Sequence, residues 1–266
     1  MAAGLSLWTE RKYHLNKMTL RELLFAYFTH HSILIYLALI IISLWLVGTF
    51  AESAGPPLLA ALVIVLIYPL VEYVLHRYLL HSRLLYRYKA TAALWKRVHY
   101  DHHQNPNDLR VLFGALYTSL PTIFVIATPV GWLIGGLAGA AAACATALLL
   151  FSLYEFCHCV QHLPFTPRYE WLRALKKHHL SHHFHSEQGN FGITSMIWDR
   201  VFATLYRRPQ DVPRSATVHN LGYAGGEREA YPWVAEISDD DASFDAARRR
   251  RRPGTDGTAG RDPASA

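Results

Sequence analysis

An uninterrupted apolar stretch near the N-terminus constrains the fold of this chain more than any other feature. Residues 32–50, SILIYLALIIISLWLVGTF, carry no charged side chain and are long enough for a helix to cross the hydrocarbon core of a bilayer. Further apolar stretches cover residues 58–81, 109–130 and 131–157. Hydrophobic residues make up 52% of the chain and charged residues 17%, a balance typical of membrane proteins. The sequence therefore predicts an all-α, polytopic membrane protein with about four transmembrane helices.

The links between these stretches predict their orientation. Residues 51–57, AESAGPP, form a tight turn, and Pro129-Val-Gly131 separates the last two stretches, which are expected to form a helical hairpin. Lys and Arg are concentrated near the N-terminus and in residues 83–110 and 168–208, and they are absent from both turns. By the positive-inside rule, both termini and the histidine-rich segments are cytoplasmic, most simply in a bacterial inner membrane.

The parts outside the spans differ in composition. Thr19 and Glu22 form a capping box that opens a short amphipathic helix, expected in the headgroup region. The first 30 residues contain no small-residue cleavage site, so no signal peptide is expected. The expected organisation is a cytoplasmic N-terminus (1–31), a membrane domain (32–206), a cytoplasmic extension (207–236) and a disordered, charged tail (237–266).

Histidines form four clusters: HRYLLH, HYDHH, HCVQH and HLSHH. Each cluster lies at the end of an apolar stretch or in the segment after one, which predicts a histidine-rich helical cap on the cytoplasmic side. Positions i, i+3 and i+4 share one face of a helix, so each HxxHH is expected to direct three imidazoles to one point and HxxxH two. The clusters contain His76, His81, His99, His102, His103, His158, His162, His179, His182 and His183.

We interpret these ten histidines as metal ligands. A structural zinc takes four ligands and a catalytic zinc three plus water, so ten imidazoles indicate two metal ions. Imidazole binds iron, zinc and copper alike, so the ligand type does not identify the metal. The chain has no HExxH motif, and Glu72, Glu155 and Glu187 lie outside the clusters or at their margins, which disfavours a hydrolase with bridging carboxylates and favours redox chemistry with oxygen. The scattered His14, His30, His31 and His219 are interpreted as structural.

The order of these motifs resembles the fatty acid hydroxylase superfamily, the sterol desaturase-like integral-membrane di-iron oxygenases. The resemblance runs from about residue 70 to 206 and includes HYDHHQNPND and NFGITSMIWDRVFATLY. It implies that the ten histidines bind two iron ions, for which zinc can substitute on purification. It also implies an oxidoreductase of lipid metabolism that uses dioxygen and externally supplied electrons to hydroxylate a C–H bond of a fatty acyl chain, sphingoid or similar amphiphile. Desaturation, and sterol- or carotenoid-type hydroxylation, are alternatives within the superfamily.

Other residues are candidates for supporting roles. His178 is a rival ligand in the fourth cluster, and His185, Asn190 and Asp199 could bind a metal or orient the imidazoles. No catalytic residue beyond the metal ligands is predicted.

The partners follow from the same interpretation. Some members of the superfamily carry a fused cytochrome domain, but residues 1–70 and 207–266 leave no room for one. The electron donor is therefore expected to be a separate protein of ferredoxin or cytochrome type, attracted by the basic face if it is acidic. Nucleic-acid binding is not indicated. A haem- or quinone-binding subunit without catalysis is an alternative of another class, but it predicts single facing histidines rather than HxxHH triplets. A membrane zinc hydrolase is a further alternative.

Overall fold

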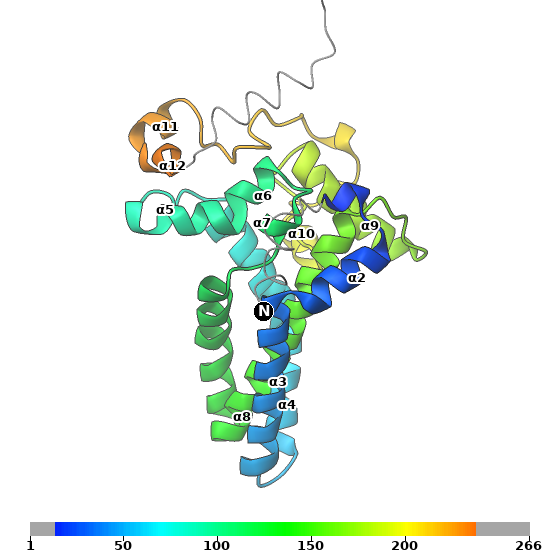
Figure 1. The fold of residues 1–266 in the computed structure, drawn as a ribbon, viewed down its shortest axis with the longest axis vertical. Coiled ribbons are helices and arrows are strands. Elements are labelled where there is room, and N and C mark those ends of the chain that lie inside the picture. Colours follow the sequence, from blue (N-terminus) through cyan, green and yellow to red (C-terminus); the bar gives the residue numbers. More distant parts are fainter. Residues whose placement is uncertain (1–13, 238–266) are drawn as a thin grey trace, which may run out of the picture.

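The structure, a computed structural model, describes residues 14–237, and within them the regular elements are helices, with one isolated β-bridge between His14 and Asp108. The all-α prediction is confirmed for this part of the chain. Residues 1–13 and 238–266, which include nearly all of the expected tail, lie outside the described residues. Figure 1 shows a stem of long helices that carries a cap of short helices at one end.

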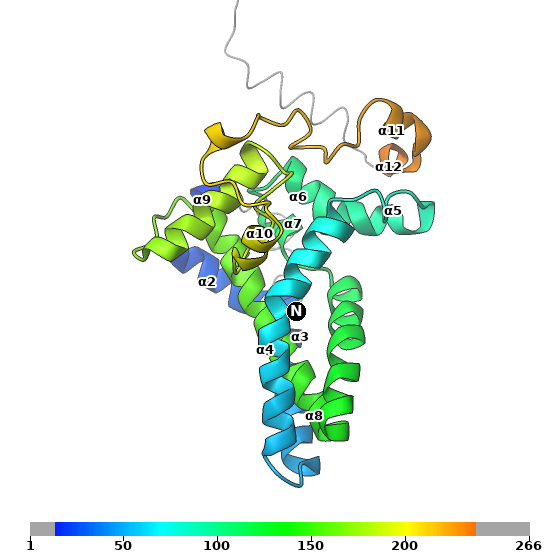
Figure 2. The same cartoon turned by 180° about the vertical axis from the view of Figure 1, so that it is seen from behind.

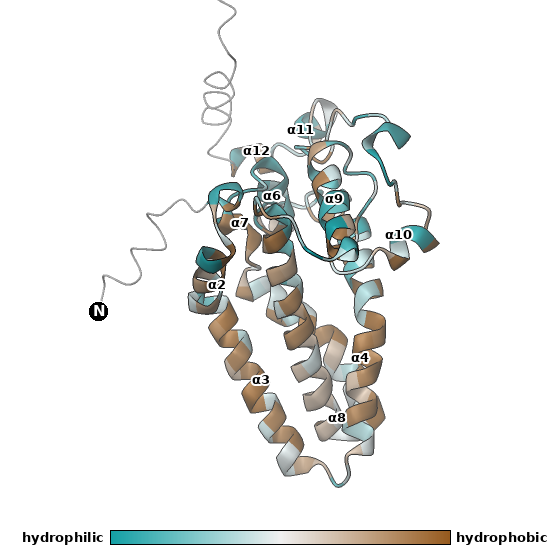
Figure 3. Cartoon of the chain, turned by 90° about the vertical axis from the view of Figure 1, so that its right-hand side faces the viewer, coloured by the Kyte–Doolittle hydropathy of each residue, from teal (hydrophilic) through white to brown (hydrophobic). Residues whose placement is uncertain are grey.

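Three helices are long and apolar enough to cross a membrane: His31–Phe50, Gly55–Leu80 and Leu109–His162. The first is α3 (His31–Phe50), and the second is α4 (Gly55–Val74) with a π-helical turn, Leu75–Leu80. Pro56 and Pro57 lie in the first turn of α4, where a missing N–H group needs no partner. The third contains α8 (Leu116–His162), and the hydropathy colours of Figure 3 place all three in the apolar stem.

Helix α8 reverses direction within the stem, at Gly135 and Gly136, whose backbone is not helical. The two arms lie side by side, because Thr128 and Cys144 are in contact at 3.3 Å although they are 16 residues apart. The sequence predicted this reversal at residues 129–131, whereas the structure has it at residues 135–136. Pro129 is accommodated inside the helix, whereas the positive φ of 56° at Gly136 favours glycine.

Glycine at position 131 serves close packing instead. A Cβ atom at Gly131 would collide with the carbonyl oxygen of Gly139 on the opposite arm. The second arm continues with the buried run Ala140–Ala145, whose small side chains let neighbouring helices approach. If the two arms of α8 are counted separately, the stem contains four apolar helical segments, which agrees with the expected number. By length and composition alone, both arms belong to one long apolar helix, Leu109–His162.

The cap lies at the end of the stem opposite the reversal of α8 (Figures 1 and 2). Its N-terminal helix α2 (Leu20–Thr29) begins at the expected capping box, because the Thr19 side chain accepts from the Glu22 amide and the Glu22 side chain accepts from the Thr19 amide. The other cap helices are α5 (Lys89–Trp95) with a π-helical turn (Lys96–Tyr100), α6 (Asp101–Gln104), α7 (Leu109–Leu112), α9 (Glu170–Phe184), α10 (Ile197–Val201), α11 (Gly226–Ala230) and α12 (Trp233–Glu236), with 3₁₀ turns at Leu15–Lys17 and Pro209–Asp211.

Two apolar clusters hold this arrangement together. The larger lies between α2, α3, α4 and α8 and includes Leu23, Tyr36, Ile64 and Leu148. The smaller is aromatic and joins α5 to the C-terminal part of the described chain through Trp95, among other residues. Residues 207–236, expected as an extension, therefore pack onto the cap.

Candidate metal centre

Local helix geometry brings His76 and His81 together. They lie five residues apart, a spacing that an α-helix would not place on one face. The chain here forms a π-helical turn, in which the His81 amide donates to the His76 carbonyl at 3.1 Å, an i→i+5 hydrogen bond. The Nε2 atoms of the two imidazoles are consequently 3.2 Å apart.

Five histidines form a first group, in which one ligand nitrogen from each lies within 4.8 Å of all the others. The members of this first histidine group are His76, His81, His99, His103 and His182. The Nε2 atoms of His99 and His81 are 2.8 Å apart, and those of His182 and His103 are 3.2 Å apart.

The other five histidines form a second group with the same property. The members of this second histidine group are His102, His158, His162, His179 and His183. The Nε2 atoms of His102 and His183 are 3.0 Å apart, and those of His162 and His179 are 2.9 Å apart. All ten histidines singled out from the sequence are thus brought together.

Each HxxHH cluster is divided between the two groups, which corrects the expectation that its three imidazoles meet at one point. His99 and His103 belong to the first group and His102 to the second, whereas in HLSHH the i+3 residue His182 belongs to the first. The reason is the helical repeat, because positions i+3 and i+4 point about 100° apart. Two neighbouring groups can therefore share one helix.

The geometry of both groups fits a metal ion. A neutral imidazole has one donor and one acceptor, so five imidazoles converging on one point cannot all satisfy each other. At metal–nitrogen distances of about 2.1 Å, ligand atoms at right angles lie about 3 Å apart, which matches the observed nitrogen pairs. The residues present therefore fit a histidine-bound metal in each group.

Burial keeps these imidazoles in the form that binds metal. Nine of the ten side chains are buried, and His81 is partly buried. Burial, with neighbouring imidazoles as the next cause, holds the pKa of His99, His102 and His183 well below the ordinary value. Burial likewise lowers the pKa of His182 to about 4. The rings are consequently neutral near pH 7 and keep a lone pair for a metal.

The two groups differ in their outer contacts. In the first histidine group, three imidazoles donate from Nδ1 to backbone carbonyl oxygens: His76 to Phe191 at 2.5 Å, His103 to Val218 at 3.0 Å and His182 to Gly189 at 2.8 Å. In the second group, each imidazole has a buried nitrogen without a hydrogen-bond partner among the described residues: His102 Nδ1, His158 Nε2, His162 Nδ1, His179 Nδ1 and His183 Nδ1.

Residues 189–192, the carbonyl strap, supply two of those three carbonyl oxygens. Asp199 is fully buried, and its carboxylate accepts from the amides of Phe191 at 2.9 Å and Gly192 at 2.7 Å. The side chain of Asn190 exchanges hydrogen bonds with the backbone of Tyr206, at 3.1 Å and 3.0 Å. Neither side chain contacts an imidazole, so the expectation that Asn190 and Asp199 bind a metal or orient the imidazoles directly is not met. Both contact the backbone instead.

The remaining histidines lie outside both groups. His178 Nδ1 is 3.1 Å from the Tyr206 carbonyl and His185 Nε2 is 2.9 Å from the Val212 carbonyl, so neither joins a ligand cluster. His30 caps α3 by accepting from the Ser32 amide, and His219 lies 3.3 Å from the His103 carbonyl.

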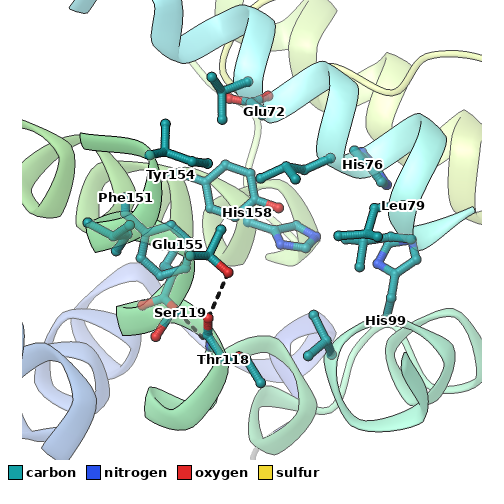
Figure 4. A pocket seen from close by; sticks show the side chains of 18 of the residues that line it. Glu72, His76, Leu79, His99, Thr118, Ser119, Phe151, Tyr154, Glu155 and His158 are labelled. Carbon is teal, nitrogen blue, oxygen red and sulfur yellow. Dashed lines mark hydrogen bonds between the residues drawn. The ribbon is translucent and has the colours of Figure 1, made fainter. Parts of the chain in front are cut away.

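An apolar cavity of about 220 Å³ ends at the histidines (Figure 4). Its walls come mainly from α4 and both arms of α8. His76 and His99 of the first group and His102 and His158 of the second also line it. The cavity is therefore in contact with both histidine groups and extends from them into the stem.

Two buried carboxylates also line the cavity, and the sequence analysis assigned them no role. Glu72 accepts from the Ile193 amide at 2.6 Å, and Glu155 accepts from the Gly114 amide at 2.6 Å. The other oxygen of Glu155 is buried without a described partner. Acidic residues inside otherwise apolar spans are a recognised signal of function, and it was available in the sequence.

Comparison with known proteins gives a consistent result. The fatty acid hydroxylase family model matches residues 61–204, which is more than half of the chain. A dihydroceramide fatty acyl 2-hydroxylase from Arabidopsis thaliana is 35% identical over 148 residues, covering 53% of this chain and 58% of that protein. The ceramide very long chain fatty acid hydroxylase of Saccharomyces cerevisiae is 34% identical, covering 57% of this chain and 38% of that protein.

A mouse protein and a solved structure are also similar to this chain. The fatty acid 2-hydroxylase of Mus musculus is 31% identical, covering 53% of this chain and 37% of that protein. This chain thus spans less than two thirds of the length of these curated relatives. A solved structure of full-length scs7p, in which only the hydroxylase domain is visible, is 29% identical with a TM-score of 0.55, covering 68% of this chain and 67% of that one.

Proposed function

Because this chain belongs to the fatty acid hydroxylase family, we propose that it is a membrane-bound di-iron oxygenase that hydroxylates a C–H bond of a lipid. Dioxygen and externally supplied electrons would be its co-substrates. The observation that carries the proposal is the apolar cavity that ends at imidazoles from both histidine groups. An apolar chain in this cavity would be held against the only groups of described residues that converge as metal ligands.

Two iron ions would occupy the two histidine groups, one in each. The five buried imidazoles of each group would hold the ion, and bound iron would supply the oxidant for an unactivated C–H bond. No catalytic side chain beyond these ligands is needed, because the cavity excludes water and positions the chain.

The proposed substrate is an amphiphile with a fatty acyl chain. The cavity wall on α4 and its π-helical turn runs from Ile64 to His76, and twelve residues of helix correspond to about 18 Å. An extended acyl chain fits such an apolar channel beside the bilayer, with its polar head near the cap. The curated relatives carry the names of acyl hydroxylases, two of them of ceramides, which favours hydroxylation of an acyl chain over desaturation or sterol chemistry.

We further propose that Asn190 and Asp199 act as positioning residues for the first histidine group. They would fix the carbonyl strap, and the strap carbonyls would then set the ring orientation of His76 and His182. Outer hydrogen bonds of this kind orient ligand imidazoles and raise their basicity.

The proposed orientation places the cap and both termini in the cytoplasm, in a bacterial inner membrane. Lys and Arg are concentrated in the cap segments, whereas the two turns at the opposite end of the stem, 51–54 and 135–136, contain neither. The electron donor would then be a separate cytoplasmic protein.

Lipidomics of cells with and without the gene tests the function. We expect one lipid class to gain the mass of a single oxygen atom when the intact protein is present, and not when the His182→Ala variant replaces it. A loss of two hydrogen atoms would assign desaturation instead. An unchanged lipid profile in cells that contain the folded, metal-loaded protein would contradict the proposal.

A further inference from the structure

Helix α9 has two faces with different surroundings. One face is buried and carries His179 and His183 of the second histidine group. The other face lines an open hollow of about 780 Å³, together with the link that precedes the helix and residues of the segment that follows it. A single helix therefore separates this hollow, the α9 hollow, from the second group.

The α9 hollow is basic. Arg173, Lys176, Lys177 and Arg214 line it, and no Asp or Glu does. The ammonium group of Lys176 already has partners within the chain, because it donates to the carbonyl oxygens of Leu163 and Phe165. Lys177 and Arg214 are exposed, and their side chains make no hydrogen bond or ion pair with another described residue. They leave two positive charges available to a partner.

The hollow also exposes aromatic surface close to the histidines. Phe184 is 42% exposed, lines the hollow and directly follows His183 in the chain. The ring centroids of these two residues are 6.4 Å apart. Phe165, which also lines the hollow, is 39% exposed. Exposed aromatic side chains beside basic ones are typical of small, electrostatically steered protein interfaces.

Backbone covers the first histidine group at three of its imidazoles. The carbonyl strap and Val218 contact its imidazoles, and Gly189, Phe191 and Val218 are all buried. Helix α12, after which the chain leaves the described residues, lies on the opposite side of the cap from α9 (Figures 1 and 2).

We propose that the α9 hollow is the docking surface for an acidic electron-carrier protein, which delivers electrons to the second histidine group across α9. This inference rests on the proposed oxygenase function, which requires reducing equivalents. One turnover takes one lipid, one dioxygen, two electrons and two protons. One oxygen atom is inserted into the C–H bond to give the hydroxylated lipid, and the other leaves as water. The carrier is oxidised in two single-electron steps. Charge complementarity selects an acidic partner, because like charges across an interface are repelled.

Charge reversal tests the docking surface. The full chain in a neutral detergent is mixed with a plant-type [2Fe–2S] ferredoxin as the acidic probe, and affinity is measured over a range of salt concentrations. We expect Lys177→Glu/Arg214→Glu to weaken binding by about tenfold or more at low salt and to flatten the salt dependence. Transfer of electrons from reduced ferredoxin should slow by a similar factor.

The control is Arg87→Glu/Lys89→Glu, an equal charge change at exposed residues beside and within α5. Lys89 pairs with Glu236 at 3.8 Å, but both side chains are exposed, so this pair contributes little to stability. We expect this control to bind ferredoxin like the wild type, and metal content confirms that all variants are folded. Equal binding by the wild type and the α9 double variant, or an equal loss in the control, would overturn the proposal.

A small-molecule reductant separates this inference from the proposed function. With reduced methyl viologen in place of ferredoxin, the α9 double variant should form product at the wild-type rate, because the dye needs no docking surface. If the wild type makes no product with either reductant, the oxygenase proposal fails, while the binding comparison still tests the docking surface. A variant that is equally slow with both reductants would contradict docking as the cause.

Discussion

The two histidine groups contain the same number of imidazoles but are oriented by different means. Three members of the first group donate to backbone carbonyl oxygens, and two of those carbonyls belong to the carbonyl strap. The second group is drawn from α6, α8 and α9, and each of its rings keeps a buried nitrogen that has no partner among the described residues. The difference teaches that identical ligand sets need not give equivalent sites. Bracing by carbonyls should make the first site the tighter one.

Removing a ligand should have the largest effect and should not distinguish the groups. We expect His103→Ala and His182→Ala in the first group, and His183→Ala in the second, each to abolish product formation while the protein still folds, because the proposed reaction requires both ions. Metal analysis should show loss of about one ion per chain. His14→Ala and His219→Ala, outside both groups, should retain activity near the wild-type level. A ligand variant that keeps both ions and full turnover would remove that histidine from the centre.

Loosening the carbonyl strap should affect the first group alone. In Asp199→Asn, one carboxylate oxygen becomes an amide that cannot accept from a backbone N–H, so the strap loses a hydrogen bond at Phe191 or Gly192. We expect the affinity for one metal ion to fall about 10- to 100-fold, with the other unchanged. Metal titration measures both. Glu227→Gln, remote from the strap, is the control, and equal weakening of both ions would contradict selective bracing.

Chelation should reveal the same difference in the unmodified protein. We expect a strong chelator to remove metal in two phases, the faster about tenfold or more ahead of the slower, with the faster phase from the unbraced second group. In His183→Ala the fast phase should disappear, and in His103→Ala the slow one. A fast phase that persists in His183→Ala would reverse the assignment.

The smallest effect is expected at His178, the histidine beside the groups. His178 lies near the Tyr206 carbonyl and belongs to neither group, so His178→Ala should reduce turnover only about two- to tenfold, the equivalent of one hydrogen bond. His179→Ala should abolish turnover. Steady-state rates and metal content measure both effects. If His178→Ala were inactive and His179→Ala active, His178 rather than His179 would face the second histidine group, and the helical register assigned to α9 would be wrong.

Sequence patterns predicted the helical class and the residues of the site better than their arrangement. Apolar length identified the stem, and histidine spacing identified the ten clustered imidazoles. The 100° between positions i+3 and i+4 separates the imidazoles of each HxxHH, but which of them share a group depends on how α6 and α9 face one another, and this was not predicted. The reversal of α8 was placed at Pro129, since a sequence does not show whether a proline bends a helix or ends it.

Contacts of the imidazoles with backbone groups were not predicted from the sequence either. The contacts that distinguish the two histidine groups use the carbonyls of Gly189, Phe191 and Val218, and every residue type has a carbonyl. Asn190 and Asp199 were noticed because they are polar, but the partner that each contacts is main chain. Glu72 and Glu155 could have been singled out as carboxylates within apolar stretches.

The π-helical turn at Leu75–Leu80 makes the end of α4 sensitive to chain length. Such a turn is equivalent to one extra residue inserted into an α-helix, and it exists here between two ligands. Deleting one residue between His76 and His81 would restore ordinary helical geometry but would leave the ligands four apart and shift all that follows by about 100°. Near the bilayer-spanning part of α4, by contrast, a change in length leaves the spacing of the ligands intact. An insertion or deletion there would still rotate both imidazoles by about 100° per residue relative to the other helices. Changes in length should therefore be disfavoured before His76 and excluded between His76 and His81, where they would also alter the ligand spacing.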